Sequence, residues 1–255
     1  MSEQKFVQLK NVSMRYPNGV TAIEGLNLTL DNSDFVSLVG PSGCGKSTLL
    51  RLIAGLIEST SGESQVHGLT PVQALKHSEI GFVFQSPTLL PWRNVEGNVQ
   101  LPLELKSGSI DQQLLATHEI LERVGLTDFT KAFPHELSGG MKMRVSLARA
   151  LVTKPKLLLM DEPFGALDEI TRERLNMDLT TFWTKDRPTI LFVTHNIYEA
   201  VFLSQRVLVM SRRPGRIVDD IAVPFAYPRL ASLRAAPHFV NLTSQVSESL
   251  SGAMM

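Results

Sequence analysis

Residues 40–48, "GPSGCGKST", combine residue types that bind phosphate groups. The glycines allow the backbone to wrap closely around phosphate oxygens, and Lys46 can reach the β and γ oxygens of a nucleotide. The Ser47 hydroxyl can then ligate Mg²⁺. A chance glycine-rich turn is the alternative, but the loop lies between a predicted strand and a helix predicted over 48–57, which is the context that the motif requires. The loop therefore predicts a nucleoside triphosphate site.

Two carboxylates, Asp161 and Glu162, directly follow an apolar run at 157–160. The pair could cap a helix, since Pro163 follows, yet two carboxylates at the end of a buried strand are costly without a cation or substrate. We expect Asp161 to hold the Mg²⁺ shell and Glu162 to polarise the attacking water. A kinase or a nucleotide switch could share Lys46 and Asp161, so Glu162 is the residue that favours hydrolysis.

Two further polar side chains end predicted strands. His195 ends the run 189–195. A single histidine is more often structural, but this position favours contact with a γ-phosphate. Gln85 follows a strand predicted over 80–84, where its amide could touch both the metal and the water. Its chemistry alone leaves that role open.

A second potential anion site lies at "LSGG", residues 137–140. Ser138, Gly139 and Gly140 come directly before an amphipathic run at 141–152, so they predict a helix start with exposed N–H groups. One nucleotide should need only one such cradle. The sequence therefore leaves the purpose of the second one to be explained.

Three nearly continuous apolar runs, at 35–40, 157–163 and 189–195, predict strands buried on both faces of a parallel sheet. Ligands bind at the carboxyl ends of such strands, so the active site should combine residues 40–48, 161–168 and the region around 195.

The flanking segments differ from these runs. Alternating residues within 1–34, with a turn at 16–19, predict a small antiparallel sheet. Residues 87–150 have mainly helical spacing and predict a helical insertion into the core. Residues 207–221 predict a hairpin with its turn at Pro214 and Gly215.

Composition excludes several classes of protein. The 255 residues contain 25 Lys plus Arg and 25 Asp plus Glu, so the chain lacks the basic footprint of a nucleic-acid partner. No apolar run approaches the ~20 residues of a membrane-spanning helix, and the N-terminus lacks a secretory signal. We expect a soluble protein, and the single cysteine fits a reducing cytoplasm.

That cysteine, Cys44, lies at a helix start beside Lys46, a setting that lowers a thiol pKa. We expect alkylation of Cys44 to inhibit hydrolysis and a bound nucleoside triphosphate to protect the thiol. The alternative is a tolerated filler whose side chain points away from the nucleotide.

The ordered set of motifs resembles the ATP-binding subunits of ABC transporters up to about residue 220. Residues 40–48 match the Walker A loop, "LSGGM" (137–141) the ABC signature and "LLLMDEP" (157–163) Walker B. "GALD" (165–168) matches the D-loop, and Tyr16, Gln85 and His195 stand where that family has its adenine-stacking aromatic, its Q-loop and its H-loop. The resemblance implies an α/β fold: a RecA-like P-loop NTPase core with an N-terminal antiparallel β subdomain and an inserted helical subdomain.

The resemblance also implies ATP and Mg²⁺ as cofactors and a role for each site residue. It assigns nucleotide contacts to Tyr16, Gly40, Pro41, Ser42, Gly43, Cys44, Gly45, Lys46, Ser47 and Thr48, catalytic roles to Glu162, His195 and Gln85, and metal ligation to Ser47, Gln85 and Asp161. Because the helical insertion should carry Ser138, Gly139 and Gly140 away from Lys46, we expect them to close over the ATP of a partner chain. A homodimer is then a requirement of the mechanism.

Departures from the family pattern are mild. Met141 and Met143 stand where glutamine is frequent, and "NSD" (32–34) replaces a glycine–glutamate turn. The ATP-binding domain would span 1–220, with its helical subdomain at about 87–150. The tail at 221–255 has no predicted role.

A narrower resemblance, carried by "SPTLLPWRNV" (86–95) and "MDEPFGALDEITR" (160–172), is to importers of nitrate, sulfonates, taurine and similar solutes, including thiamine-precursor pyrimidines. It implies a peripheral subunit on the cytoplasmic face of the bacterial inner membrane, with a periplasmic binding protein in the same system. Two permease subunits would be contacted through Leu89, Leu90, Pro91, Trp92 and Arg93. A core position in the helical subdomain is the alternative for Trp92.

Three rival classes remain. An ABC-type ATPase of DNA maintenance or translation is disfavoured because the chain has no coiled-coil heptads, second ATPase copy or basic patch. An exporter subunit would share the enzymology, and only "LLPWR" and the separate, membrane-free chain disfavour it. A P-loop GTPase or kinase has no reason to carry "LSGGM". The sequence does not identify the transported solute.

Overall fold

The computed structural model describes residues 5–106 and 109–254, so the first four residues of the predicted N-terminal sheet lie outside it. A six-stranded sheet forms the centre, in the order β5-β6-β7-β3-β8-β9. All of its neighbouring strands are parallel except β8 and β9. The strands are β3 (Phe35–Val39), β5 (Ile80–Val83), β6 (Leu157–Asp161), β7 (Thr189–Val193), β8 (Arg206–Met210) and β9 (Ile217–Ala222). The three apolar runs are therefore confirmed as the adjacent strands β6, β7 and β3, and the hairpin predicted over 207–221 is β8–β9.

A separate antiparallel sheet has the order β2-β1-β4. It comprises β1 (Val7–Arg15), β2 (Thr21–Leu30) and β4 (Ser61–Val66). The prediction of a sheet confined to 1–34 was incomplete, because β4 comes from beyond the first helix. Its residues, SGESQV, are mostly exposed and polar, so they lack the apolar alternation that identifies a strand.

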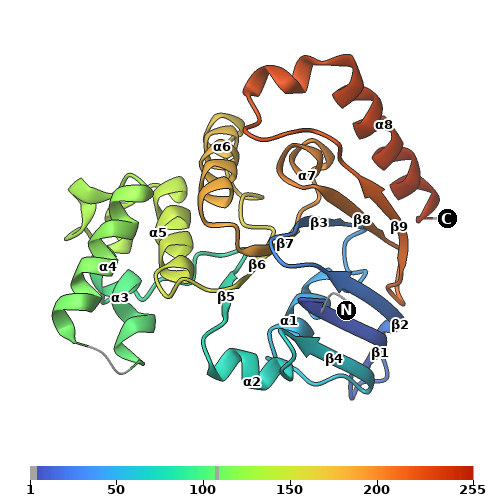
Figure 1. Cartoon of the computed structure of the whole chain (residues 1–255), viewed down its shortest axis with the longest axis horizontal. Helices are drawn as coiled ribbons and strands as arrows, with labels where there is room; N and C mark the ends of the chain where they lie inside the picture. Colours follow the sequence, from blue (N-terminus) through green and yellow to red (C-terminus); the bar gives the residue numbers. More distant parts are fainter. Residues whose placement is uncertain (1–4, 107–108, 255) are drawn as a thin grey trace.

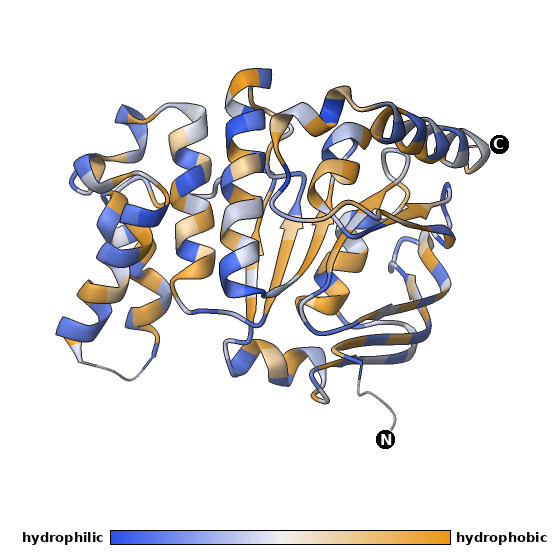
Figure 2. Ribbon diagram, turned by 45° about the horizontal axis from the view of Figure 1, so that its top comes forward, coloured by the Kyte–Doolittle hydropathy of each residue, from blue (hydrophilic) through white to orange (hydrophobic). Residues whose placement is uncertain are grey.

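Helices cover both faces of the central sheet (Figure 1). Helix α1 (Lys46–Ile53) and the antiparallel sheet lie on one face, and α6 (Glu169–Asp186) and α7 (Ile197–Leu203) lie on the other. Two hydrophobic cores fill these layers. Figure 2 shows the central strands as predominantly hydrophobic, while the outer helices alternate between polar and apolar residues. Helix α1 begins two residues earlier and ends four residues earlier than the predicted 48–57, and the short α2 (Pro71–Lys76) follows β4.

The helical elements α3 (Val95–Glu104), α4 (Ile110–Arg123) and α5 (Gly139–Leu151) lie together at one end of the molecule (Figure 1). Two short 3₁₀ turns, η1 (Thr127–Phe129) and η2 (Pro134–Glu136), connect α4 to α5. Helix α4 buries Ile120 and Leu121, whereas Leu115 and His118 are exposed.

The tail forms the turn η3 (Ala231–Ala235) and helix α8 (Pro237–Gly252), which packs on α7 and β8. Arg229 is 3% exposed and donates from Nη1 to three carbonyl oxygens at the end of α7, those of Val201, Phe202 and Ser204. Because α7 ends here, these carbonyl oxygens have no hydrogen-bond partner within the helix. The tail therefore caps α7 from outside. In the described parts of the chain, no helix is both long and apolar enough to cross a bilayer.

Candidate nucleotide-binding site

A cavity of about 330 Å³ lies where the phosphate loop meets the ends of the central strands. It is lined by Tyr16, Val20, Ala22, Ser42, Gly43, Gly45, Lys46, Ser47, Thr48, Gln85, Glu162 and Arg213. Seven of the sequence-predicted nucleotide residues and two of the predicted catalytic residues thus border one cavity. The convergence follows from topology, because the loop follows β3 and Glu162 follows β6 at the same edge of the sheet.

The phosphate loop turns into α1 at Gly45, which adopts φ 115°. A Cβ at this position would lie 2.9 Å from the Ala22 carbonyl oxygen, so both the left-handed backbone and the close approach require glycine. Lys46 is 6% exposed and donates from Nζ to the carbonyl oxygens of Gly40 at 2.7 Å and Pro41 at 3.0 Å. The loop therefore holds the ammonium at the start of α1, where helix N–H groups also favour an anion.

Ser47 and Asp161 form a pair of oxygen ligands at the base of the site. The Ser47 hydroxyl donates to Asp161 Oδ1 at 3.0 Å. Burial raises the pKa of the Asp161 carboxyl above its ordinary value, and the neighbouring Glu162 charge acts in the same direction, while the Ser47 hydrogen bond opposes both. A partly buried carboxylate of this kind is stabilised by a cation. Hydroxyl and carboxylate oxygens beside a phosphate site, with the Gln85 amide on the same cavity, fit Mg²⁺.

Glu162 leaves β6 in a left-handed conformation with φ 46°, which is rare for a residue with a side chain. Its backbone N–H donates to the Val193 carbonyl at 2.9 Å, so the end of β7 holds this conformation in place. The Glu162 Oε2 atom lies 3.0 Å from His195 Nδ1. The Glu162 side chain is 22% exposed and that of His195 60% exposed. The backbone thus brings the carboxylate and the imidazole together beside the phosphate loop.

Tyr16 lies in the turn after β1, and its hydroxyl is 3.0 Å from Thr48 Oγ1. This hydrogen bond fixes the phenol ring on the cavity wall, where a base could stack. Gln85 lies two residues beyond β5 and is exposed on the same cavity. Tyr16 and Gln85 therefore both border the nucleotide cavity.

The expectation of a reactive Cys44 is wrong. The side chain is 1% exposed, and burial raises the pKa of the thiol, although the Lys46 charge acts to lower it. Burial outweighs the charge because the side chain lies under the loop, in the core beneath the antiparallel sheet. The alternative of a filler that points away from the nucleotide is the one that fits.

Ser138 is the N-cap of α5, and its Oγ accepts the Met141 N–H at 3.3 Å. Helix α5 therefore begins at Gly139, two residues before the predicted start. Ser138 and Gly139 are exposed, and neither they nor Gly140 are among the described residues that line the nucleotide cavity. In Figure 1, α5 lies among the helices at the far end of the molecule from the antiparallel sheet. Met143 is 3% exposed in the core, so this departure from the family pattern contributes to packing.

The segment 89–93 is a fixed loop on the surface. Asn98, fully buried in α3, accepts the Leu90 N–H and donates to the carbonyls of Leu90, Arg93 and Asn94. Within that frame Trp92 is 71% exposed, which rules out the core alternative for its side chain.

Sequence reasoning missed three residues that organise these sites. Asn98 shapes the Trp92 loop, and Arg149 of α5 holds the preceding segment by donating to the carbonyls of Pro87 and Thr88. Arg213 reaches the nucleotide cavity from the β8–β9 turn. Only the turn itself was visible in the sequence, because contacts between segments so far apart leave no local pattern.

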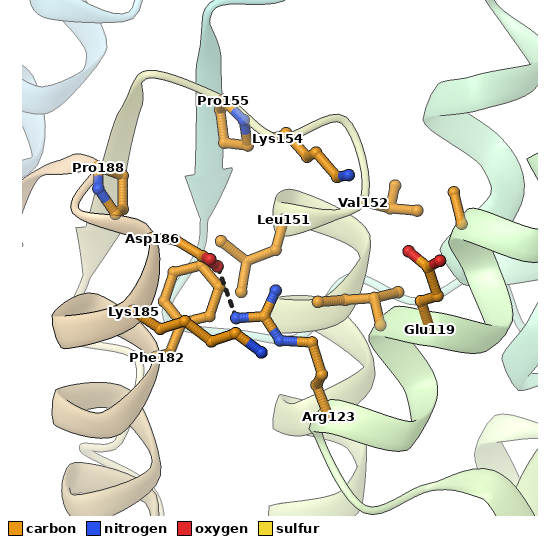
Figure 3. A pocket seen from close by; sticks show the side chains of 12 residues that line it. Glu119, Arg123, Leu151, Val152, Lys154, Pro155, Phe182, Lys185, Asp186 and Pro188 are labelled. Carbon is orange, nitrogen blue, oxygen red and sulfur yellow. Dashed lines mark hydrogen bonds and ion pairs between the residues drawn. The ribbon is translucent and has the colours of Figure 1, made fainter.

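A second cavity, of about 430 Å³, lies between α4, the end of α5 and α6 (Figure 3). Arg123 crosses it to pair with Asp186 at 2.5 Å and lies over the Phe182 ring. This cavity shares no lining residue with the nucleotide cavity. Its side chains join the helical elements to the core.

Known proteins resemble this chain in sequence and in fold. Residues 23–165 match the family model described as ABC transporter. The chain is 42% identical to a taurine import ATP-binding protein, TauB, of Rhizobium johnstonii, over 91% of this chain and 90% of that protein. It is 44% identical to an aliphatic sulfonates import ATP-binding protein, SsuB, of Bacillus cereus, over 82% of each chain. A solved ATP-binding cassette, described as a dimeric post-hydrolysis state bound to ADP and Pi, covers 86% of this chain with a TM-score of 0.77 and 32% identity.

Proposed function

Because the chain belongs to the ABC transporter family of ATP-binding proteins, we propose that it is the ATP-hydrolysing subunit of an importer for a small solute of the taurine or sulfonate type, with nitrate and thiamine-precursor pyrimidines as related candidates. The observation that carries the hydrolytic part is the placement of Lys46 and Glu162 on one cavity, with Asp161 and His195 hydrogen-bonded to its lining residues. The TauB and SsuB relatives are named as import proteins for taurine and for aliphatic sulfonates, and these names support the import direction and the class of solute.

In this mechanism Lys46 and the loop N–H groups bind the β- and γ-phosphates of ATP. Ser47, Asp161 and Gln85 would hold Mg²⁺, which would neutralise charge on the phosphates. Glu162 orients and polarises the attacking water, and the His195 imidazole holds the carboxylate through the 3.0 Å contact and faces the γ-phosphate. The Lys46 ammonium is already in place to stabilise negative charge that develops on the transferred phosphoryl group.

The Glu162→Gln variant tests the hydrolytic role. Removal of the carboxylate charge should lower ATP turnover about 100-fold or more, the scale of a lost general base. ATP binding should persist, and the variant should accumulate as a dimer on gel filtration with ATP. Glu122→Gln, an exposed carboxylate on α4, is the matched control. Unchanged hydrolysis in the Glu162 variant would remove this residue from the base role.

Two copies of the chain would form the working enzyme, each covering the other's ATP with Ser138, Gly139 and Gly140. Support comes from the solved dimeric cassette that this chain resembles and from the exposure of Ser138 and Gly139 outside their own cavity. ATP would favour the closed dimer because it contacts both chains, and hydrolysis would release them. The exporter subunit is the alternative with the same enzymology.

The membrane partner would be a pair of permease subunits docked on Leu89, Leu90, Pro91, Trp92 and Arg93, on the cytoplasmic face of the inner membrane, with a periplasmic binding protein supplying the solute. Trp92 is a large exposed aromatic on a loop fixed by Asn98, which suits an interface anchor. Trp92→Ala should leave the ATPase activity of the isolated protein unchanged and lower solute uptake by the assembled transporter about tenfold or more. Leu115→Ala, an exposed apolar residue on α4, is the control. Normal uptake by the Trp92 variant would refute this docking surface.

A further inference from the structure

The turn between β8 and β9, residues 211–216, lies directly against the phosphate loop although about 170 positions separate them in the chain. The Gly215 N–H donates to the Ala22 carbonyl at 2.9 Å. A Cβ at Gly215 would lie 2.3 Å from the Cys44 carbonyl oxygen, so a side chain at this position would collide with the phosphate loop. The turn is therefore part of the wall of the nucleotide site.

Arg213 extends from this turn onto the phosphate loop. Its Nε and Nη2 atoms both donate to the Gly43 carbonyl oxygen, at 3.1 and 2.8 Å. The side chain is exposed and lines the same cavity as Lys46 and Tyr16. A guanidinium carries five N–H donors, and the two bonds to Gly43 are the hydrogen bonds that its side chain makes within residues 5–106 and 109–254. Three donors thus remain for a ligand.

The C-terminal segment also holds the β8–β9 turn in place. The Arg212 N–H donates to the Ala253 carbonyl at 3.3 Å, and Ser249 of α8 donates to Asp219 of β9 at 2.7 Å. The C-terminal helix therefore fixes the hairpin that presents Arg213. A donor held in place before the ligand arrives loses less entropy on binding.

We propose that Arg213 is a nucleotide-binding residue that donates to the phosphate chain of ATP while it holds the Gly43 peptide of the phosphate loop. Lys46 is nearly buried at the start of α1, so Arg213 supplies a second, more exposed cation to the same cavity. Guanidinium N–H groups match phosphate oxygens in geometry and charge. The proposal rests on the nucleotide site of the proposed function and adds a residue from outside the sequence motifs.

Equilibrium binding of ATP and ADP to the full chain, measured by competition with a fluorescent nucleotide at several salt concentrations, tests the proposal. Arg213→Ala should raise the Kd for both nucleotides about fivefold to tenfold, the scale of one partly exposed charge-assisted hydrogen bond. It should also flatten the salt dependence of the Kd. The Kd of Arg213→Lys should fall between those of the wild type and Arg213→Ala, because lysine keeps the charge and lacks the paired N–H donors of the guanidinium.

Arg212→Ala is the matched control. It removes the same charge from the adjacent exposed position, and the contact of Arg212 to Ala253 is made by its backbone, which the substitution keeps. Its Kd should stay within about twofold of the wild type, as expected for an exposed charge that is not among the lining residues of the nucleotide cavity. Unfolding temperatures measured without nucleotide show whether each variant is folded.

The two proposals fail in different ways. If the wild type binds no ATP, the proposed function fails. If the wild type binds ATP and Arg213→Ala binds it as tightly as Arg212→Ala does, the role of Arg213 alone is overturned. A raised Kd with the salt dependence of Arg212→Ala would also overturn it, because a phosphate contact must be sensitive to salt.

Discussion

Two helices of this chain begin beside glycines, since α1 follows the glycine-rich phosphate loop and α5 starts at Gly139, and their surroundings differ. The first turn of α1 carries Lys46 and Ser47 into a cavity that other segments of the same chain enclose. The first turn of α5 begins with Ser138 as its cap and Gly139 exposed, and neither faces that cavity. The contrast teaches that a helix N-terminus supplies donors for an anion, whereas a complete site also needs side chains from elsewhere. For α1 those come from β6 and the β8–β9 turn, and for α5 we propose that a second chain supplies the rest.

The largest expected effect comes from a mixture of two inactive variants. Ser138→Arg should bind ATP and yet fail to dimerise or hydrolyse it, while Lys46→Ala should lose the phosphate contact. Each alone should show about 1% of wild-type turnover or less. In a mixed dimer, the intact loop of one chain meets the intact "LSGG" of the other. An equimolar mixture should therefore recover at most about half of wild-type activity, because Ser138→Arg chains would pair only with Lys46→Ala chains and each mixed dimer has one of its two sites intact.

A steady-state ATPase assay on the mixture and on each variant alone measures this recovery. Ser138→Ala is the control for the helix cap, and it should cost stability by about 1 kcal/mol without a new clash. If Ser138→Arg alone turned over ATP normally, or if the mixture stayed inactive, the two helix starts would not share a site between chains.

Gly140 could serve packing against α6 or contact with a partner's nucleotide, and a smaller expected effect separates these two roles. A Cβ at this position would lie 2.6 Å from the Thr171 Cγ2 atom of α6, so packing within the chain already disfavours a side chain there. Gly140→Ala should lower the free energy of unfolding by about 1–3 kcal/mol through this overlap. Thr171→Ser removes the methyl group, so the double variant should regain stability.

The ATPase activity of the stable double variant then decides between packing and catalysis. We expect it to remain low, because we propose that Gly140 also contacts the partner's ATP and the added methyl group would disturb that contact. Full recovery of activity along with stability, as judged by thermal unfolding, would mean that Gly140 serves only the contact with α6.

The smallest effect concerns Cys44, under the phosphate loop. Because its thiol is 1% exposed and burial raises its pKa, we expect little thiolate near neutral pH. A higher pH should increase the reactive fraction only as it passes the raised pKa. Iodoacetamide should therefore label the native protein slowly and at similar rates with and without ATP, and label the denatured protein at an ordinary rate. Rapid native labelling that ATP blocks would restore the earlier expectation of a reactive cysteine.

Much of the fold followed from local patterns. The apolar runs of β3, β6 and β7 identified a parallel sheet because strands buried on both faces need apolar residues throughout. Strand β4 escaped notice because most of its residues are exposed and polar. Strand β4 is extended because it pairs with β1, although α1 lies between the two strands in the sequence.

The features of the nucleotide site can likewise be divided into those that the sequence determines and those that the tertiary structure decides. The sequence by itself determined the phosphate loop, the carboxylates Asp161 and Glu162, and the order of motifs, because their chemistry depends on residue types at short spacing. Tertiary structure alone decided the burial of Cys44, the Glu162–His195 contact, the frame that Asn98 builds under Trp92, and the approach of Arg213 to Gly43. Burial and contact depend on what distant segments place beside a residue, and no local spacing records that.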